Sequence, residues 1–224
     1  MTWDGRRLTI ERLGSAVPRE RERLRALRGF RAQVLHADGR RPEFRTAGGC
    51  YADAQEIDEE SFHISVSDPA DNAVVAYGRL SPAELTHHFQ TRDYLGDARF
   101  HEMTVSLNTD VAGVWEAGRL VVAPQSRGQG PMAAVGAALM AMARTLDAHA
   151  LVAVSGMQDR QHILWGRFGL RECPGTHGYS AHYQDDLCVV AWRTAAVVGR
   201  YETGLRALQD TLVSAATDRG VRMR

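Results

Sequence analysis

The sequence predicts an α+β fold in which a mixed, mostly antiparallel central sheet is flanked by helices. A hairpin joins two short apolar segments before residue 81, and a later strand runs through a glycine-rich turn into a helix. Hairpins combined with strand-to-helix connections are typical of α+β sheets. The 224 residues are enough for a core that needs no disulfides. We expect one domain over residues 1–195 and a C-terminal amphipathic helix with a tail over residues 196–224.

The composition excludes several classes of partner. The 27 basic residues, all of them arginine, balance 27 acidic residues. A protein that binds nucleic acid or an anionic membrane needs a net basic surface or patch, so we expect neither partner. No segment approaches the length of a membrane span, and the polar N-terminus has no signal-peptide pattern. Three cysteines without zinc or redox spacing are typical of a reducing compartment, so we expect a cytoplasmic protein.

The first helix is predicted over residues 18–35, after a short strand over residues 6–13. Its apolar residues recur at helical spacing and form one stripe: Leu24, Leu27, Val34 and Leu35. Arg31 lies four residues from both Leu27 and Leu35 and therefore on this stripe. An arginine in that position either pairs with an anion or extends to water, and the pattern leaves both open.

Residues 36–60 form a predicted loop, punctuated by glycines, that ends in an acidic run, and most such runs are solvated. Strands are predicted over residues 61–67 and 73–80, because the Asp-Pro-Ala-Asp-Asn turn between them is typical of a hairpin. Residues 81–113 show no legible pattern. The scattered ligand-type residues there are His87, His88, His101 and Glu102. They lack metal-ligand spacing, so we expect no metal site.

The second half of the chain alternates strands and helices. The predicted series is a strand at 115–123, a turn at 124–130, a helix at 131–148, a strand at 150–155, a helix at 159–167 and a strand at 186–194. The last helix carries an apolar stripe made of Tyr201, Leu205, Leu208 and Leu212. This stripe is expected either to cap the sheet or to mediate a homodimer, and residues 219–224 are expected to fray.

The glycine-rich turn at residues 124–130 is the most informative segment. A strand followed by such a turn and a helix aims backbone N–H groups and the positive helix end at one point, which is typical of a phosphate site. Gly128 and Gly130 permit a close approach of the backbone. No Gly-Lys-Ser/Thr follows, so the turn is not a P-loop, and the three-glycine spacing of dinucleotide sites is absent.

The segment from Val121 to Met132 resembles the signature of the GCN5-related N-acetyltransferase (GNAT) superfamily, Arg/Gln-x-x-Gly-x-Gly/Ala after a strand that ends Val-x-Pro. In this sequence it reads Val-Val-Ala-Pro-Gln-Ser-Arg-Gly-Gln-Gly-Pro-Met, with methionine where the family has a small residue. The resemblance implies the GNAT fold. It implies that the donor pyrophosphate binds at Arg127, Gly128, Gln129, Gly130 and Met132.

A second segment, Trp165-Gly-Arg-Phe-Gly-Leu170, is similar to the Tyr-x-x-x-Gly-Phe segment of the same family. Trp165 stands in place of the tyrosine that often protonates the leaving thiolate. An indole cannot act as that acid at neutral pH, which leaves another group such as Tyr179 or Tyr183.

A narrower resemblance is to the acyl-homoserine-lactone synthases and long-chain N-acyl amino acid synthases within this superfamily. It rests on Trp115-Glu116-x-x-Arg119, on Arg79-Leu-Ser-Pro82, on Arg31 in the first helix, and on the acidic residues Glu56 and Asp58. The resemblance implies a substrate pocket formed by Arg31, Asp58, Arg79 and Arg119. It also implies that the three arginines pair with Asp58 and Glu116, which would explain an arginine on an apolar helix face.

The resemblance implies an N-acyltransferase that moves an acyl group from a phosphopantetheine thioester, on acyl-CoA or acyl carrier protein, directly to the amine of an amino acid or related small molecule. Glu116 is the candidate base, and backbone N–H groups of Val121, Val122 and Ala123 are candidates for binding the thioester oxygen. Acyl carrier protein is a candidate partner, and no metal cofactor is expected.

Three alternatives stay open. The first is an acetyl-CoA-dependent N-acetyltransferase of a small molecule or protein, and the second is a module that binds acyl-CoA without catalysis. The third concerns the site: Glu116 and Arg119 would form an ordinary ion pair within the sheet and have no catalytic role. Cys173 and Cys188 are expected to be inert.

Overall fold

The computed structural model describes residues 1–3, 5–83, 89–158 and 160–218, which form two compact units. Unit 1 consists of Met1–Ser81, Gly118–Val135 and Ala181–Gln184, and unit 2 of Pro82–Ala117, Gly136–Ser180 and Asp185–Arg224. His87, His88 and the expected frayed tail lie outside the described residues.

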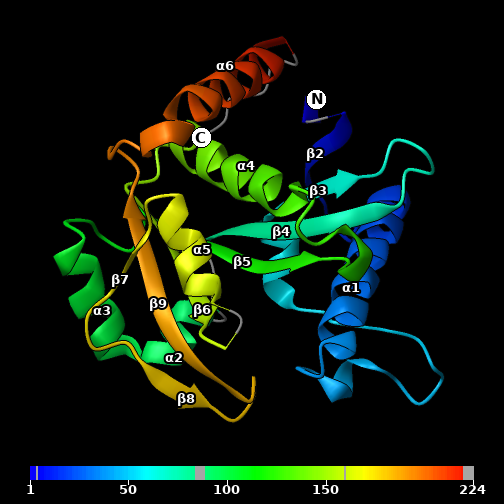
Figure 1. Cartoon of the computed structure of the whole chain (residues 1–224), viewed down its shortest axis with the longest axis horizontal. Coiled ribbons are helices and arrows are strands. Elements are labelled where there is room, and N and C mark those ends of the chain that lie inside the picture. Colours follow the sequence, from blue (N-terminus) through cyan, green and yellow to red (C-terminus); the bar gives the residue numbers. More distant parts are fainter. Residues whose placement is uncertain (4, 84–88, 159, 219–224) are drawn as a thin grey trace. The chain divides into compact units, whose positions relative to one another are not determined.

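The strands follow the order β1-β2-β3-β4-β5-β6-β9-β7, with β8 paired to β9 (Figure 1). They are β1 (Thr2–Trp3), β2 (Arg6–Arg12), β3 (Phe62–Ser67), β4 (Val74–Pro82), β5 (Val114–Val122), β6 (Ala150–Gly156), β7 (Arg171–Glu172), β8 (Gly178–Ser180) and β9 (Asp185–Arg193). The α-helices are α1 (Pro18–Ala37), α2 (Gln90–Leu95), α3 (Asp97–Ser106), α4 (Pro131–Thr145), α5 (Gln161–Arg167) and α6 (Glu202–Asp218). Short 3₁₀ helices are η1 (Pro42–Phe44), η2 (Glu56–Glu60), η3 (Pro124–Ser126) and η4 (Gly199–Tyr201).

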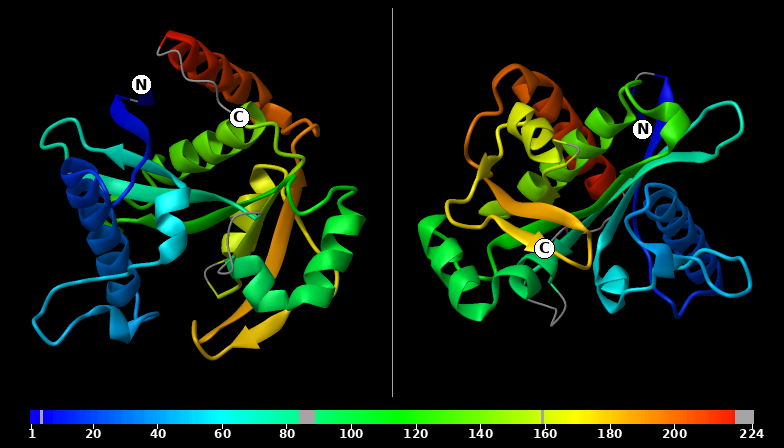
Figure 2. Two further views of the ribbon diagram at one scale, coloured as in Figure 1. Left: turned by 180° about the vertical axis from the view of Figure 1, so that it is seen from behind. Right: turned by 60° about the horizontal axis from the view of Figure 1, so that its bottom comes forward.

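Unit 1 is an antiparallel meander with one long helix against it. Strands β2, β3 and β4 pair in register through Ile10, Ile64 and Gly78. Figures 1 and 2 show α1 alongside these strands. Its apolar stripe is buried in the core cluster formed by Leu13, Leu24, Leu27, Ala32, Val34, Leu35, Phe44, Tyr77 and Val121. The predicted stripe of the first helix is therefore confirmed, and it places the buried Arg31 against the sheet.

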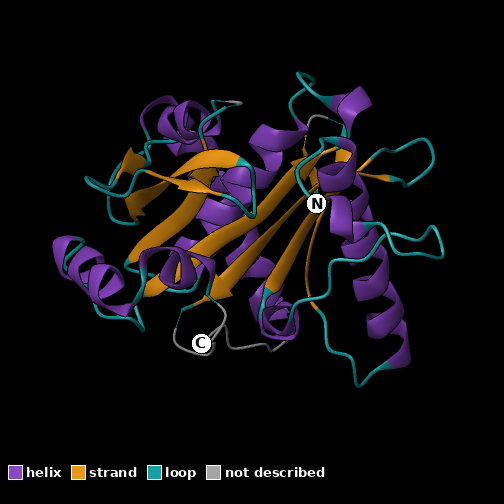
Figure 3. Ribbon diagram, turned by 90° about the horizontal axis from the view of Figure 1, so that it is seen from below, coloured by secondary structure: helices purple, strands orange, loops and turns teal. Residues whose placement is uncertain are grey.

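Unit 2 combines one parallel and several antiparallel pairings. β5 pairs with β6 in parallel only over Val114–Glu116, and β6 pairs with β9 in antiparallel fashion along its whole length. Helix α5 contacts β6, β7 and β9, and Figure 3 distinguishes the strands from the helices beside them. The parallel register ends at Glu116, three residues before Arg119 adopts φ of 54°. A left-handed residue inside a strand interrupts the alternation of its side chains.

Trp165 is a core residue of unit 2. It lies on α5, is buried and packs against Phe168 with ring centroids 6.4 Å apart. Phe168 stacks on Tyr201 and fills the space beside Gly136, where a Cβ would approach the Phe168 ring to 3.2 Å. The side chain that stands in the place of the usual tyrosine is thus held by packing.

The sequence predicted the long elements correctly and missed the short ones. The mixed, mostly antiparallel sheet with flanking helices is confirmed. Helices α2 and α3 form in the segment that showed no pattern. Helix α2 was missed because it is only six residues long and ends at Gly96, whose φ is 75°. Strands β7 and β8 have two and three residues, too few for a periodic pattern.

Helix α6 uses its apolar stripe inside this chain. Leu205, Leu208 and Leu212 are all buried. Arg144 on α4 anchors the start of α6, because its Nη1 donates to Oε1 of Glu202 at 2.9 Å and its guanidinium lies over the Trp192 ring. These three leucines of the stripe are therefore covered within this chain. Among the described residues, no helix combines the length and apolarity that a membrane span requires.

Replacing Leu205 with alanine is expected to lower the free energy of unfolding by about 2–5 kcal/mol, because the residue is 1% exposed and its loss leaves a cavity. The matched control, Val213→Ala, changes a residue of the same helix that is 47% exposed, and is expected to stay within about 0.5 kcal/mol. Urea denaturation followed by circular dichroism measures both. Equal small changes in the two variants would contradict the packing of α6.

Candidate active site

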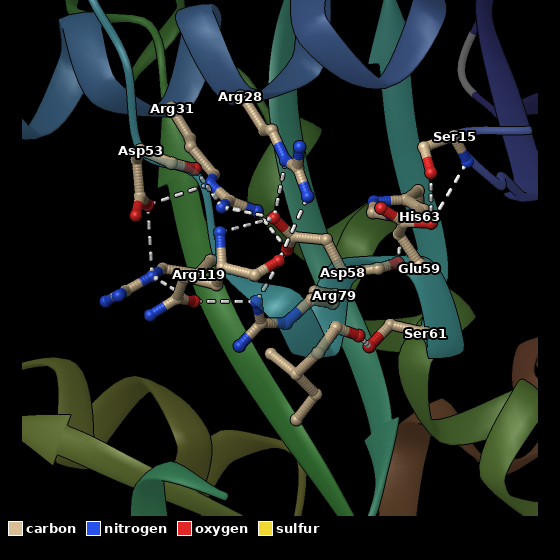
Figure 4. Close-up of polar contacts among 12 residues, drawn as sticks. Ser15, Arg28, Arg31, Asp53, Asp58, Glu59, Ser61, His63, Arg79 and Arg119 are labelled. Atoms are coloured by element: carbon tan, nitrogen blue, oxygen red, sulfur yellow. Dashed lines mark hydrogen bonds and ion pairs between the residues drawn. The ribbon is translucent and has the colours of Figure 1, made fainter. Parts of the chain in front are cut away.

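Arg31 reaches from α1 to two carboxylates of the acidic run. Its Nη1 and Nη2 donate to Oδ1 and Oδ2 of Asp58 at 2.6 and 2.8 Å, and its Nε donates to Oδ2 of Asp53 at 2.8 Å (Figure 4). Nη2 also donates to the backbone oxygen of Asp53. All three side chains are buried, so Arg31 pairs with anions and does not extend to water. Bidentate geometry matches the planar guanidinium to the carboxylate and offsets the cost of burial.

Asp58 is shared by three arginines. Besides Arg31, Nε of Arg28 donates to its Oδ2 at 2.8 Å and Nη1 of Arg79 donates to its Oδ1 at 2.7 Å. Oδ2 also accepts the backbone N–H of Gln55 at the start of η2. Burial alone would raise the pKa of the Asp58 carboxyl, but its ion pairs and hydrogen bonds with Arg31 and Arg79 outweigh burial and hold the pKa far below its usual value.

A neutral histidine lies on the other side of this network. Nε2 of His63 is 2.8 Å from the backbone oxygen of Asp58, and Nδ1 is 2.8 Å from the hydroxyl of Tyr77. A carbonyl oxygen only accepts, so Nε2 carries the proton and Nδ1 accepts from Tyr77. Burial lowers the pKa of His63 to about 4, with the nearby arginines acting in the same direction. The imidazole is therefore neutral at pH 7.

Arg119 joins the network from β5. Its Nε lies 3.2 Å from Oδ2 of Asp53 and 3.2 Å from Oε1 of Gln55, and its Nη1 donates to the Tyr183 hydroxyl at 2.8 Å. Gln55 Oε1 also accepts from Nη1 of Arg79 at 2.7 Å. The left-handed conformation of Arg119 costs about 1–2 kcal/mol in a non-glycine residue, and these contacts offset that cost. The four residues expected to form the pocket, Arg31, Asp58, Arg79 and Arg119, all lie in this network.

Arg119 makes an ion pair with Asp53, a partner that the sequence did not suggest for it. Glu116 is 1% exposed, and its Oε2 accepts hydrogen bonds from the backbone N–H and the hydroxyl of Thr91 at 2.7 and 2.6 Å. Thr91 belongs to α2, which sequence patterns did not reveal. The two hydrogen bonds fix one carboxylate oxygen of the candidate base.

The glycine-rich turn has the backbone conformation expected of an anion site. Gly128 and Gly130 have φ of 77° and 92°, which residues with a Cβ rarely adopt, and α4 begins directly after them. The side chain of Arg127 forms an ion pair with Asp38, because its Nη2 donates to both carboxylate oxygens of Asp38 at 2.7 Å. Arg6 holds the other side of the turn through the backbone oxygen of Gln129 at 2.7 Å. Met132 lies in the first turn of α4.

The backbone before the turn also departs from expectation at one residue. Val121, Val122 and Ala123 are buried, but the N–H of Ala123 donates to the backbone oxygen of Val75 at 2.8 Å. It is therefore not free to bind a thioester oxygen. Arg127 Nε donates to the backbone oxygen of Val122 at 3.4 Å.

The remaining residues that the sequence singled out differ in burial and in their contacts. Tyr179 is 67% exposed, whereas Tyr183 accepts the hydrogen bond from Arg119. Burial raises the pKa of Cys173 and of Cys188 to about 11, so both thiols are protonated at neutral pH. Glu56, one of the two acidic residues named from the resemblance, is exposed, and Asp53 takes the buried position instead.

Sequence patterns missed several members of the network: Arg28, Arg41, Asp53, Gln55, His63 and Tyr77. They also missed Thr91, which contacts Glu116. Most of them lie in loops or at strand positions that carry no periodic signal. Two signals were present, since Arg28 is three residues before Arg31 on the same helix and Asp53 opens the acidic run.

The fold is shared with solved acyltransferases. BjaI, a CoA-dependent acyl-homoserine lactone synthase solved with SAM and isopentyl-CoA, has a TM-score of 0.63 and 14% identity over 93% of this chain and 90% of its own. FeeM, an N-acyl amino acid synthase from uncultured soil microbes, has a TM-score of 0.54 and 11% identity over 84% of this chain and 92% of its own.

An acetyltransferase assigned to the GNAT family, from Desulfovibrio desulfuricans, has a TM-score of 0.50 and 13% identity over 84% of this chain and all of its own. No protein-family model and no curated protein sequence matches the chain. The chain therefore shares the fold of these solved proteins, which is the GNAT fold that its turn motif predicted.

The neutral His63 predicts a loss of stability in mild acid. The unfolded chain binds a proton near pH 6.5, whereas the folded chain binds it only near pH 4. The free energy of unfolding is therefore expected to fall by up to about 3 kcal/mol as the pH drops from 6.5 to 4. The pKa of Asp58 is lowered in the folded chain, so this group reduces the free energy of unfolding further only below its ordinary pKa of 3.8.

Urea unfolding at several pH values measures this effect. The variant His63→Gln is expected to have a smaller slope between pH 6.5 and 4, because it no longer titrates. The control His101→Gln, at an exposed position of α3, is expected to keep the slope of the unmodified protein. An unchanged slope in His63→Gln would contradict the neutral, buried imidazole.

Proposed function

We propose that this protein is an N-acyltransferase that moves an acyl group from a phosphopantetheine thioester, on coenzyme A or acyl carrier protein, to the amine of an amino acid or related small molecule. Strand β5 carries the proposal. It holds the buried carboxylate of Glu116 and the left-handed Arg119, and it leads into the glycine turn before α4. The fold shared with BjaI, solved with SAM and isopentyl-CoA, supports the same class of reaction.

The donor binds at the glycine turn in this proposal. Backbone N–H groups around Gly128 and Gly130 and the N-terminus of the 15-residue helix α4 favour the pyrophosphate of coenzyme A or the single phosphate of a carrier-protein phosphopantetheine. Arg127 and Arg6 hold the turn in position through Asp38 and Gln129. Arg127 therefore acts mainly by positioning the backbone.

Glu116 acts as the base. An amine acceptor is mostly protonated at pH 7, and a carboxylate that takes its proton, directly or through a water molecule, contributes about 10²- to 10⁴-fold. The neutral nitrogen attacks the thioester carbonyl, a C–N bond forms and the C–S bond breaks. The oxyanion is held by the N–H of Val121 or Val122, worth roughly 3 kcal/mol per donor. The sulfur leaves readily as a thiolate because the pKa of the thiol is about 8.5, and the thiolate takes up the second proton that the nitrogen loses as the amide forms.

One observation favours a second candidate function, a module that binds acyl-CoA without turning it over. Trp165 takes the place of the usual tyrosine acid and is buried against Phe168. A panel of donors (acetyl-CoA, a long-chain acyl-CoA and acylated acyl carrier protein) tested with a panel of amines distinguishes the candidates through thiol release. Release with the long-chain donors supports the proposal, release with acetyl-CoA alone supports an N-acetyltransferase, and no release supports the module.

The variant Glu116→Gln is expected to lower kcat by about 10²-fold or more, because glutamine accepts the Thr91 hydrogen bonds but takes no proton. The free energy of unfolding is expected to change much less than the turnover. Steady-state thiol release and urea unfolding measure the two quantities. The control Glu102→Gln, an exposed carboxylate on α3, is expected to keep full activity. Retained activity in Glu116→Gln would remove Glu116 from the base role.

A further inference from the structure

Three side chains of different ligand chemistry meet beside strand β9 in unit 2. They are the carboxylate of Glu172, the imidazole of His177 and the thiol of Cys188, and one potential ligand atom of each lies within 4.8 Å of the other two. None of the three belongs to the buried arginine network or to the glycine turn. Their spacing in the chain matches no zinc motif, so no sequence pattern indicated this group.

Strand pairing brings the three residues together. Glu172 ends β7 and pairs with Val190 of β9, which lies two residues after Cys188 and therefore on the same face of the strand. His177 directly precedes β8, whose first residue pairs with the neighbour of Cys188 on β9. Figure 1 shows β7 and β8 on either part of β9. The backbone thus holds all three side chains against one strand.

The turn between β7 and β8 is also fastened from helix α2. The hydroxyl of Tyr94 lies 2.9, 3.2 and 3.0 Å from the backbone oxygens of Thr176, Gly178 and Leu187. The hydroxyl of Thr176 accepts the backbone N–H of Val189 on β9 at 3.0 Å. A backbone that is already fixed loses less entropy when its side chains bind a ligand. The turn is therefore preorganised for binding.

The chemistry of this set suits a zinc ion. Zinc takes carboxylate, imidazole and thiolate ligands at about 2.0–2.3 Å in a tetrahedral arrangement, which places neighbouring ligand atoms about 3.5 Å apart. Nε2 of His177 lies 3.0 Å from Oε2 of Glu172, and the two side chains are 50% and 42% exposed, so small rotations reach that separation. Magnesium and calcium prefer oxygen ligands alone, whereas a thiolate beside an imidazole favours zinc.

Cys188 supplies the innermost ligand. It is 0% exposed, and burial, followed by the neighbouring Glu172 and Cys173, raises the pKa of its thiol to about 11. A bound dication deprotonates a coordinating thiol, and the proton passes to solvent. The thiolate and the Glu172 carboxylate together neutralise the two charges of zinc, so binding adds no net charge to the interior. The half-exposed side chains of Glu172 and His177 leave an entry path from solvent.

A second histidine lies beside the same carboxylate. Nε2 of His162 on α5 is 3.9 Å from Oε1 of Glu172, whereas His177 contacts the other oxygen, Oε2. Nδ1 of His162 is buried and has no hydrogen bond within the described part of the chain. Groups that lie behind a ligating side chain orient it and raise the affinity for the metal. The structure therefore provides a carboxylate with a metal-facing oxygen and an oxygen that faces His162.

We propose that Glu172, His177 and Cys188 bind one zinc ion, with a water molecule in the fourth position, and that the ion fastens β7 and the following turn to β9. Strands β7 and β8 have only two and three residues, and pairing of such short strands is weak by itself. A metal that joins them to β9 contributes its binding free energy to the stability of this segment. The inference does not depend on the proposed acyl transfer.

Metal binding tests the site without any turnover. The probes are Co²⁺ and Zn²⁺, added to the untagged chain after dialysis against a chelator. One equivalent of Co²⁺ is expected to produce a sulfur-to-cobalt charge-transfer band in the near ultraviolet, and Zn²⁺ is expected to remove it by displacement. His177→Gln is expected to weaken Zn²⁺ binding by about 10²-fold or more, because even the outer partners of ligands contribute about 10- to 10²-fold. The matched control His182→Gln, at another exposed histidine, is expected to keep the affinity.

Cysteine variants identify the sulfur ligand. Cys188→Ser is expected to lose the charge-transfer band, whereas Cys173→Ser and Cys50→Ser are expected to keep it. If Cys188→Ser does not fold, His177→Gln and Glu172→Gln test the site through Zn²⁺ affinity, since both positions are exposed. The proposal is overturned if Co²⁺ produces no such band, if the band depends on Cys173 or Cys50, or if His177→Gln binds Zn²⁺ as tightly as the unmodified chain.

Amide hydrogen exchange tests the structural role of the ion. At a free Zn²⁺ concentration about 100 times Kd, exchange at residues 171–180 is expected to slow by up to about 10²-fold in the unmodified protein. Exchange in α1 is expected to stay the same, and His177→Gln is expected to show no slowing at residues 171–180 under the same conditions. Equal exchange with and without saturating Zn²⁺ would overturn the role of the ion in fastening β7 to β9.

Discussion

The organisation of unit 1 depends on one carboxylate, that of Asp58, which three arginines share. Arg28 and Arg31 come from α1 and Arg79 from β4, so the contacts tie the helix, the short 3₁₀ helix η2 and the sheet together at one point. Hydrophobic packing along the α1 stripe is non-directional. The bidentate pair adds direction, because its geometry allows only a narrow range of helix positions.

The same network determines the protonation state of the histidine beside it. His63 stays neutral beside Asp58 and adds no positive charge of its own. Nε and Nη1 of Arg41 are buried without a hydrogen bond among the described residues, although Nη1 lies 3.2 Å from the half-exposed carboxylate of Glu43. The zero net charge of the whole chain therefore coexists with buried charges of both signs, which pair with one another.

The fold and part of the network could be predicted from the sequence. Arg31 was visible as a polar residue on an apolar helical stripe, and Arg79 and Arg119 as members of short motifs on regular strands. Asp53 was visible only as the first residue of the acidic run, and Gln55 and Arg41 had no signal, because their positions depend on irregular loops between α1 and β3. The partner of Glu116 is Thr91, on a six-residue helix 25 residues earlier in the chain, and no local pattern encodes such a contact.

The most direct test of the central claim is a double-mutant cycle between Arg31 and Asp58. The single variants Arg31→Met and Asp58→Asn are each expected to lower the free energy of unfolding by about 3–5 kcal/mol, since each removes the bidentate ion pair and leaves the charge balance of the buried network incomplete. The double variant is expected to lose less than the sum of the two by about 2 kcal/mol or more. Additive losses, within about 0.5 kcal/mol, would contradict the claim that this pair holds unit 1 together.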